Sequence, residues 1–439
     1  MLNRTRISLL KASLVILTLI CVATPPASAL TIYYTYGDKS GGLASLEVNS
    51  AGDISDHKVV GDGIITPYKL AISAKGDRAI VISDDNAKAT IFDVGATPKQ
   101  LAVLDLGATG KSLVPVGDHA LVSADEGLFN WINLDQGTIE KTFDAKKDLH
   151  PSGTRGEGLF LLPDHKTVLI PFQKDNSKGT HFGSRMLVFD LDTMTPRFDL
   201  QLPRNHPDLN IVGNLKEQGP NPEVAFMSPK NDTVMLTLDL YGAIAFAKLS
   251  SALEGKWDNL EYIPSSMDGT WGNAFPDRGL LFTSADKDYL LISNASPDGG
   301  LVLFDVATRK VIGKYPAPGG CENPVLLSHG QKVVTVTSGK TKTRLTIKQD
   351  KEFYPKNILY SFDLKPLKDG KPATVESITF DKPVQKVQAI DPEHNDLLFL
   401  VLGADSSELV IYDLDSKTIL HREPTKGAVQ RVTTYQEGK

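Results

Sequence analysis

Short strand-like segments separated by turn residues recur along the chain, and this recurrence constrains the fold more than any other feature. Residues 289–315 show one unit: an apolar run, a Ser-Pro-Asp-Gly-Gly turn, a second apolar run through Asp305, a polar turn and a third run. Runs of β-branched and aromatic residues bounded by Gly, Pro and Asp predict strands joined by hairpin turns. The repeat therefore predicts an all-β fold.

The apolar run that often ends in Asp is taken as the third strand of each unit. It occurs in eight copies, at 43–48, 89–94, 128–134, 185–191, 243–249, 301–306, 358–364 and 408–414. The Asp or its equivalent recurs at intervals of 45, 40, 57, 58, 57, 58 and 50 residues. A period of this size built from strands alone is typical of a β-propeller with four-stranded blades. Eight blades are favoured; seven are the alternative, because the first and fifth copies lack the Asp.

The two ends of the repeat region are complementary. Residues 31–36 have the pattern of a second strand with no first strand before it, and residues 429–435 form a strand with nothing after it. Pairing the two would close the ring as a hybrid blade and leave no exposed sheet edge at the seam. We therefore expect residues 30–439 to form one propeller domain.

The units resemble the YVTN/NHL-like extracytoplasmic propeller repeats, whose pattern is an apolar strand, a Ser-containing turn, a second apolar strand and a third strand ending in Asp. The matching segments are 72–83, 228–237 and 409–414. Residues 189–203 are also similar, locally, to the propeller heavy chains of periplasmic amine dehydrogenases. Both resemblances imply a fold, not an activity.

Residues 1–29 have the pattern of a secretory signal peptide. Arg4, Arg6 and Lys11 precede a short apolar stretch, and Ala-Ser-Ala ends the segment at residue 29. The stretch is too short to span a bilayer. A lipoprotein anchor on Cys21 is the alternative, disfavoured by the bulky Ile20. We expect a periplasmic or secreted protein with no membrane span.

The charge balance bears on the kind of partner. Loss of the three basic residues of the predicted signal peptide changes the formal charge from −6 to −6 − 3 = −9. An acidic chain without a basic cluster in its sequence argues against a nucleic-acid partner. Cys321 would be the one cysteine left, so no intrachain disulfide is expected.

Polar residues recur where the inner strands begin. They are Arg155 and Glu157, Asn221 and Glu223, Trp271 and Asn273, and Cys321, Glu322 and Asn323. Inner strands line the central channel of a propeller, so these residues are predicted to converge on one mouth of it. They would form a site for a small polar ligand, or their oxygens would bind a divalent cation such as Ca²⁺, with Glu157, Glu223 and Glu322 as metal ligands.

A structural interpretation competes with each of these assignments. Asn and Glu beside Pro and Gly often satisfy free backbone groups at the start of a strand. Cys321 has no base nearby in sequence and fits a buried, inert thiol better than a nucleophile. Trp271 would stack on a ligand ring or pack against the neighbouring blade. His150, His165, His181 and His206 lack the spacing of a specific metal site.

Three connections exceed the length of a hairpin, at 173–184, 203–220 and 338–357. Long loops on a rigid ring either contact partners or are tolerated insertions. We therefore favour a binding or scaffold protein that presents its loops and channel mouth to a protein partner or a small polar ligand. The alternative is an enzyme with unknown catalytic residues, either a metal-assisted lactone or ester hydrolase or an amine-dehydrogenase-like redox component.

Overall fold

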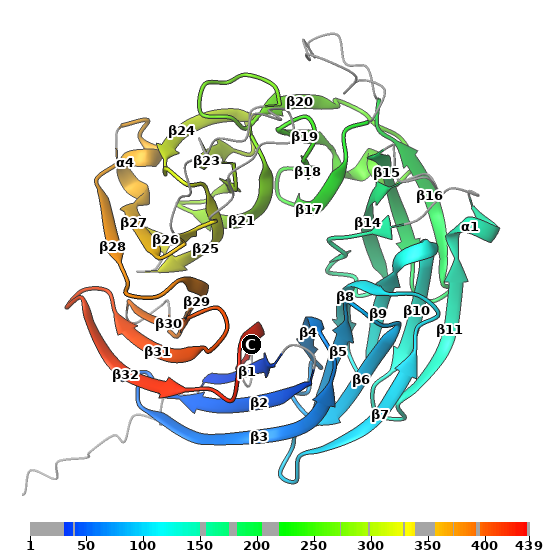
Figure 1. Cartoon of the computed structure of the whole chain (residues 1–439). Helices are drawn as coiled ribbons and strands as arrows, with labels where there is room; N and C mark the ends of the chain where they lie inside the picture. Colours follow the sequence, from blue (N-terminus) through cyan, green and yellow to red (C-terminus); the bar gives the residue numbers. More distant parts are fainter. Residues whose placement is uncertain are drawn as a thin grey trace, which may run out of the picture.

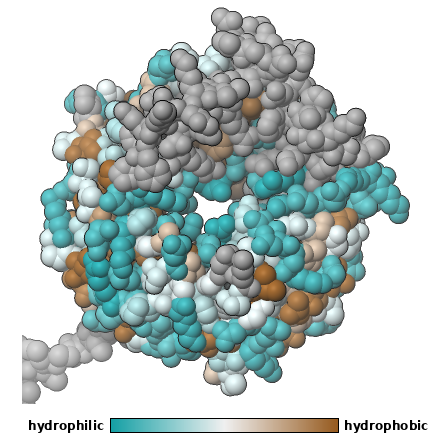
Figure 2. Space-filling model, in the orientation of Figure 1, coloured by the Kyte–Doolittle hydropathy of each residue, from teal (hydrophilic) through white to brown (hydrophobic). Residues whose placement is uncertain are grey.

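The computed structural model describes residues 30–37, 40–149, 155–174, 182–203, 219–272, 274–296, 299–327, 330–338, 356–371, 373–391 and 396–436. The predicted signal peptide lies outside these residues and stays a prediction. The described strands form antiparallel sheets that are arranged radially as eight blades (Figure 1), and the space-filling view shows a central channel between them (Figure 2).

The first four blades follow one another along the chain, and each begins with its inner strand. Blade 1 holds β4 (Pro67–Ile72), β5 (Arg78–Ser83), β6 (Lys88–Asp93) and β7 (Lys99–Asp105); blade 2 holds β8 (Gly110–Val116), β9 (His119–Ala124), β10 (Leu128–Asn133) and β11 (Thr138–Asp144). Blade 3 holds β12 (Arg155–Gly156), β13 (Phe160–Leu161), β14 (Thr167–Lys174), β15 (Phe182–Asp190) and β16 (Thr195–Gln201); blade 4 holds β17 (Pro222–Ser228), β18 (Thr233–Leu238), β19 (Ala243–Lys248) and β20 (Glu261–Pro264).

The remaining blades continue this order until the last one, which combines both ends of the repeat region. Blade 5 holds β21 (Pro276–Ser284), β22 (Lys287–Asn294), β23 (Gly300–Asp305) and β24 (Lys310–Pro316); blade 6 holds β25 (Cys321–Leu327), β26 (Lys332–Thr337), β27 (Ile358–Asp363) and β28 (Val375–Thr379). Blade 7 holds β29 (Val384–Ala389), β30 (Leu397–Leu402), β31 (Glu408–Asp413) and β32 (Thr418–Pro424); blade 8 holds β33 (Val429–Tyr435), β1 (Leu30–Tyr36), β2 (Gly41–Val48) and β3 (Ile54–Ile64). Single helical turns occur between strands at η1 (Asp125–Gly127), α1 (Ala145–Asp148), α3 (Leu249–Ala252) and α4 (Leu364–Lys368).

The predicted architecture and blade count are confirmed. Each of the eight predicted third strands overlaps the third strand of one blade, including the first and fifth copies, which lack the Asp. The hybrid blade is also confirmed, because β1 pairs with β33 in antiparallel register from Thr31–Tyr435 to Thr35–Arg431. The ring is thus closed by pairing between the first and the last of the described strands.

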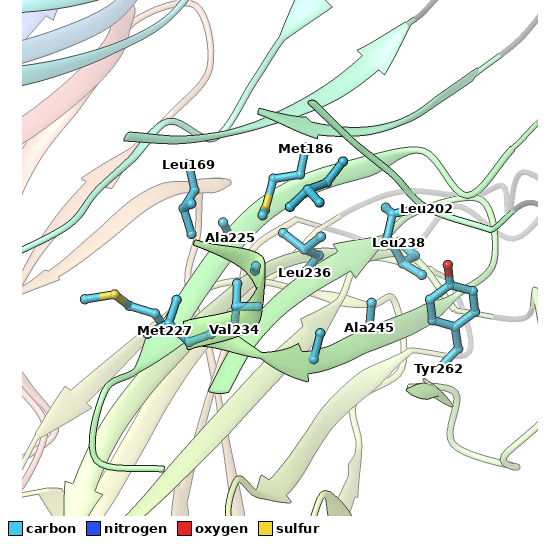
Figure 3. Packing of buried hydrophobic residues seen from close by; sticks show 14 of the residues in the cluster. Leu169, Met186, Leu202, Ala225, Met227, Val234, Leu236, Leu238, Ala245 and Tyr262 are labelled. Atoms are coloured by element: carbon cyan, nitrogen blue, oxygen red, sulfur yellow. The ribbon is translucent and has the colours of Figure 1, made fainter. Parts of the chain in front are cut away.

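The hydrophobic core lies between blades. Each cluster of buried apolar residues draws on two adjacent blades, and together the clusters fill every blade interface. Figure 3 shows the cluster between blades 3 and 4, where Leu169 and Met186 face Ala225 and Leu236. Second strands such as β30 are buried along their whole length, whereas outer strands such as β32 alternate with exposed residues. The inner strands are thereby held rigidly around the channel.

None of the helices in the described part of the chain is long and apolar enough to cross a membrane.

Candidate ligand site in the central channel

Each inner strand has a register shift near its start, where it pairs with the second strand of its blade. In blade 1 the shift lies between Pro67 and Lys69, and in blade 7 between Val384 and Lys386. Such a β-bulge inserts an unpaired residue and re-aims the side chains that follow it. The residue that resumes the pairing is basic in four blades: Lys69, Arg278, Lys386 and Arg431.

These four basic residues line one cavity in the channel. It has a volume of about 580 Å³ and is bounded by residues of β4, β21, β25, β29 and β33, the inner strands of blades 5 to 8 and blade 1. No aspartate or glutamate is among the described residues that line it. Figure 2 shows hydrophilic residues bordering the central opening on the face in view. The described lining of the cavity is therefore cationic, although the chain carries a formal charge of −6.

The ammonium group of Lys386 is held in an unfavourable environment. Burial, together with the charges of Arg431 and Lys356, lowers the pKa of Lys386 from 10.5 to about 8. Glu322 acts in the opposite sense and Arg278 adds to the repulsion. Within the described ranges, no carboxylate lies within ion-pair distance of Lys386. Its charge is thus largely uncompensated.

Lys69, on β4, is in a similarly unfavourable environment on the other side of blade 8. Burial, then Arg278 and Arg431, lower the pKa of Lys69 to about 8, while Glu157 and Glu223 raise it in part. Burial also lowers the pKa of Arg431, with a further contribution from Arg278. Like charges lower the pKa of a lysine only at short range, so Lys69 and Lys386 each lie near Arg278 and Arg431.

Arg431 is oriented by its neighbour on β4. Its guanidinium donates from Nε to the carbonyl oxygen of Tyr68 and lies 5.1 Å from the centroid of the Tyr68 ring. A second donor, Nη1, reaches the carbonyl of Gln430 at 2.9 Å. These contacts fix the guanidinium by backbone and ring interactions and leave its charge without a carboxylate partner among the described residues.

The acidic residues predicted from the sequence lie on the adjoining arc of the channel, and arginines bind them. Arg155 Nε donates to Glu157 Oε1 at 2.8 Å, and Arg278 Nη1 lies 3.2 Å from Glu223 Oε1. Burial raises the pKa of Glu157 above its ordinary value, and the nearby Glu223 adds to this effect against Arg155. The structure therefore brings Arg155, Glu157 and Glu223 together.

The other predicted residues are placed differently. Asn221 is buried with φ 54°, and its amide lies 3.4 Å from Asp239 Oδ2. Cys321 is fully buried in the cluster between blades 5 and 6, where burial raises the pKa of its thiol to about 12. Trp271 packs against the cluster between blades 3 and 4. Asn323 lines the cavity.

Glu322 is half-buried beside Asn323, and its carbonyl oxygen accepts a hydrogen bond from Thr335. His165 is exposed in a turn. Asn273, His150, His181 and His206 lie outside the described residues.

Metal ligands are not gathered in the part of the chain that the structure describes. No group of three or more His, Cys, Asp or Glu side chains there is placed to hold a metal ion. Glu157 and Glu223 each face an arginine instead. Calcium binding by Glu157, Glu223 and Glu322 stays a prediction of the sequence.

Comparison with known proteins agrees with this architecture. The structure superposes on dihydro-heme d1 dehydrogenase NirN in complex with DHE with a TM-score of 0.67 and 13% identity, over 94% of this chain and 76% of that one. Apo AztD from Citrobacter koseri gives a TM-score of 0.59 and 13% identity over 94% and 99% of the chains, and BamB from Moraxella catarrhalis gives 0.52 and 14% over 90% and 93%. The chain is a β-propeller repeat protein. At these identities the likeness shows the fold alone. No family model matches the propeller, and no curated protein matches it significantly.

Sequence reasoning missed the four basic residues of the propeller's channel. A pattern for them exists: β29 begins Val-Gln-Lys-Val, β33 begins Val-Gln-Arg-Val, and β4 and β21 begin Pro-Tyr-Lys and Pro-Asp-Arg. In each case the basic residue is the third of the strand. An alignment on the inner strands, instead of the third strands, would have revealed the recurrence.

Proposed function

We propose that the protein is an extracytoplasmic propeller that binds a small polar ligand in the cationic cavity of its channel. The observation that carries the proposal is the cavity itself. A volume of about 580 Å³ lies within the range of roughly 300–1,000 Å³ that is common for small-molecule sites. Its walls come from inner strands of five blades, which gives the preformed, rigid enclosure that such sites need.

The predicted signal peptide at residues 1–29 and the resemblance to extracytoplasmic propeller repeats support the location. The similar protein NirN has been solved in complex with DHE, which supports a search for a bound molecule in this chain. Neither the hydrolase nor the redox alternative gains a specific feature from the site, because Glu157 and Glu223 face arginines and Cys321 is buried.

Native mass spectrometry of the mature protein, purified gently from the extracytoplasmic fraction, tests the proposal. Gln388 lines the cavity, two residues beyond Lys386 on the same strand. Gln388→Trp fills the channel without a change of charge, so we expect a copurified small molecule on the wild type and none on this variant. Gln100→Trp, on the exposed outer strand β7, is the control that should keep the molecule.

Two outcomes would contradict the proposal. One is a wild-type protein that carries and binds no small molecule, and the other is binding that Gln388→Trp leaves unchanged. Retention of the full-length chain in the cytoplasm, without removal of residues 1–29, would overturn the extracytoplasmic part.

A further inference from the structure

Basic residues from four blades line one cavity in the channel. Lys69, Arg278, Lys386 and Arg431 occupy equivalent positions, each immediately after the bulge of its inner strand. Because the blades are related by rotation about the channel axis, equivalent positions surround a shared volume. All four residues line the same cavity.

This arrangement destabilises the folded protein. Lys69, Lys386 and Arg431 have no ion-pair partner within the described ranges, and the positive charges of Arg278 and Arg431 act against both lysines. Half-buried charges without partners destabilise a fold, and apolar or neutral residues at these positions would avoid the cost. Residues that lower stability in this way are typical of functional sites.

A negatively charged ligand would offset the repulsion between these basic residues. Several cations from separate strands match a ligand with more than one anionic group, since carboxylate and phosphate oxygens accept charge-assisted hydrogen bonds from arginine and lysine. The cavity wall also contains the apolar side chains of Leu280, Val325 and Ala389. These would contact an organic body between the anionic groups.

We propose that the ligand is a small organic anion with two or more carboxylate or phosphate groups, bound jointly by Lys69, Arg278, Lys386 and Arg431. This inference rests on the proposed function, because it names the class of ligand for the same cavity. The bulges provide the geometry: each is followed by one basic residue, and all four of these residues line the same cavity.

Calorimetric titration of the mature chain with defined probes tests the inference. Citrate represents a polycarboxylate, pyrophosphate a polyphosphate, inorganic phosphate a single anionic group and sucrose a neutral molecule. We expect citrate or pyrophosphate to bind at least about tenfold more tightly than phosphate, and sucrose not to bind. The preferred probe distinguishes carboxylate from phosphate recognition.

Charge-removing variants assign the binding to these residues. Lys386→Met and Lys69→Met should each weaken binding of the preferred probe about tenfold, and Lys386→Arg should retain it. Lys310→Met is the matched control, because Lys310 is an exposed lysine at the start of β24. Affinity should also fall between pH 7 and pH 9.5, as Lys69 and Lys386 lose their protons in the field of Arg278, Arg431, Lys356, Glu157, Glu223 and Glu322.

The failure of this inference is distinguishable from that of the proposed function. The inference is wrong if no polyanionic probe binds, if the probes bind Lys386→Met and Lys69→Met as well as the wild type, or if the copurified molecule is neutral or cationic. In the last case the small molecule still requires an open channel, so its loss from Gln388→Trp would uphold the proposed function. Binding that Gln388→Trp leaves intact would overturn both.

Discussion

Buried hydroxyl groups on the second strands support the bulges of the inner strands. The N–H of Val224 donates to Thr237 Oγ1 at 3.0 Å, and Thr335 Oγ1 donates to the carbonyl of Glu322 at 2.8 Å. Both threonines are fully buried. A bulge leaves backbone groups without ladder partners, and a hydroxyl opposite the bulge satisfies one of them. These hydroxyls therefore help to set the direction of the channel side chains.

Replacement of such a threonine should cost stability without a change of shape. Thr237→Val leaves the N–H of Val224 unsatisfied in a partly buried site, which should lower the free energy of unfolding by about 1–2 kcal/mol. Thr97→Val, at an exposed turn position, should be neutral. Chemical denaturation of both variants measures the difference. Equal midpoints would show that the hydroxyl does not support the bulge.

Replacement of a basic residue of the channel should raise the stability of the protein, in contrast to replacement of a threonine. The pKa of Lys386 is lowered to about 8 from 10.5, so below pH 8 the folded protein carries the full cost of the charge. The difference between these pKa values, 10.5 − 8 = 2.5, corresponds to about 3 kcal/mol, and we expect about 1 kcal/mol after screening by water in the open channel. Lys386→Met should therefore be more stable than the wild type at pH 7.

The pH dependence follows from the same shift. Between pH 8 and 10.5 the unfolded chain binds more protons at Lys386 than the folded chain, so this residue makes the wild type gain stability as pH rises through that window. The advantage of Lys386→Met should shrink accordingly. Denaturant melts at pH 7 and pH 10 check this, with Lys310→Met as the control. A variant less stable than the wild type at pH 7 would refute the uncompensated charge.

At the scale of the strand, the sequence predicted the elements but not the four basic residues that line the channel. Periodic apolar runs located all eight third strands, because burial between blades imposes the pattern directly. The channel residues escaped prediction because side-chain alternation has a period of two, and a bulge changes its phase. Thus Cys321 and Glu322 precede the bulge of β25, whereas Lys386 directly follows the bulge of β29, where the alternation no longer indicates which side chains face the channel.

Blade 3 shows why one inner strand is broken. β12 and β13 are separated at Gly158, which has φ +59° and an ideal Cβ position only 2.1 Å from the carbonyl oxygen of Glu223 on β17. The residue combines a left-handed conformation with a close approach of two backbones, and both require glycine. The break lets the chain pass next to the strand that carries Glu223.

Gly158→Ala should therefore be strongly destabilising. Backbone strain and the clash with β17 together should cost about 2–3 kcal/mol. Gly117→Ala separates the two causes, because Gly117 has φ +62° but no atom within 4 Å of its ideal Cβ position. That control should cost only about 1 kcal/mol. Thermal melts of the two variants give the comparison; equal losses would mean that β12 and β17 separate at little cost.

At the scale of the molecule, stability and the cationic cavity depend on the same closure. β33 supplies the inner strand of blade 8, and its Arg431 completes the basic lining beside Lys69 and Lys386. Val429 belongs to the apolar cluster that joins blades 7 and 8. Without β33, the edge of β1 would be unpaired and the cluster open to solvent. Closure of the ring and assembly of the site are therefore one event.

Deletion of residues 428–439 should lower the melting temperature by at least about 10 °C and abolish probe binding. A synthetic peptide of residues 428–436 added in trans should restore both, because it can add to the exposed edge of β1 as the missing strand. A peptide of scrambled sequence is the control. If the deleted chain melts like the full chain, or regains binding without the peptide, then pairing of β1 with β33 is not what holds the blades in a ring. A peptide that carries Arg431→Gln separates the structural contribution of the strand from that of its charge. This peptide should restore the melting temperature but not probe binding.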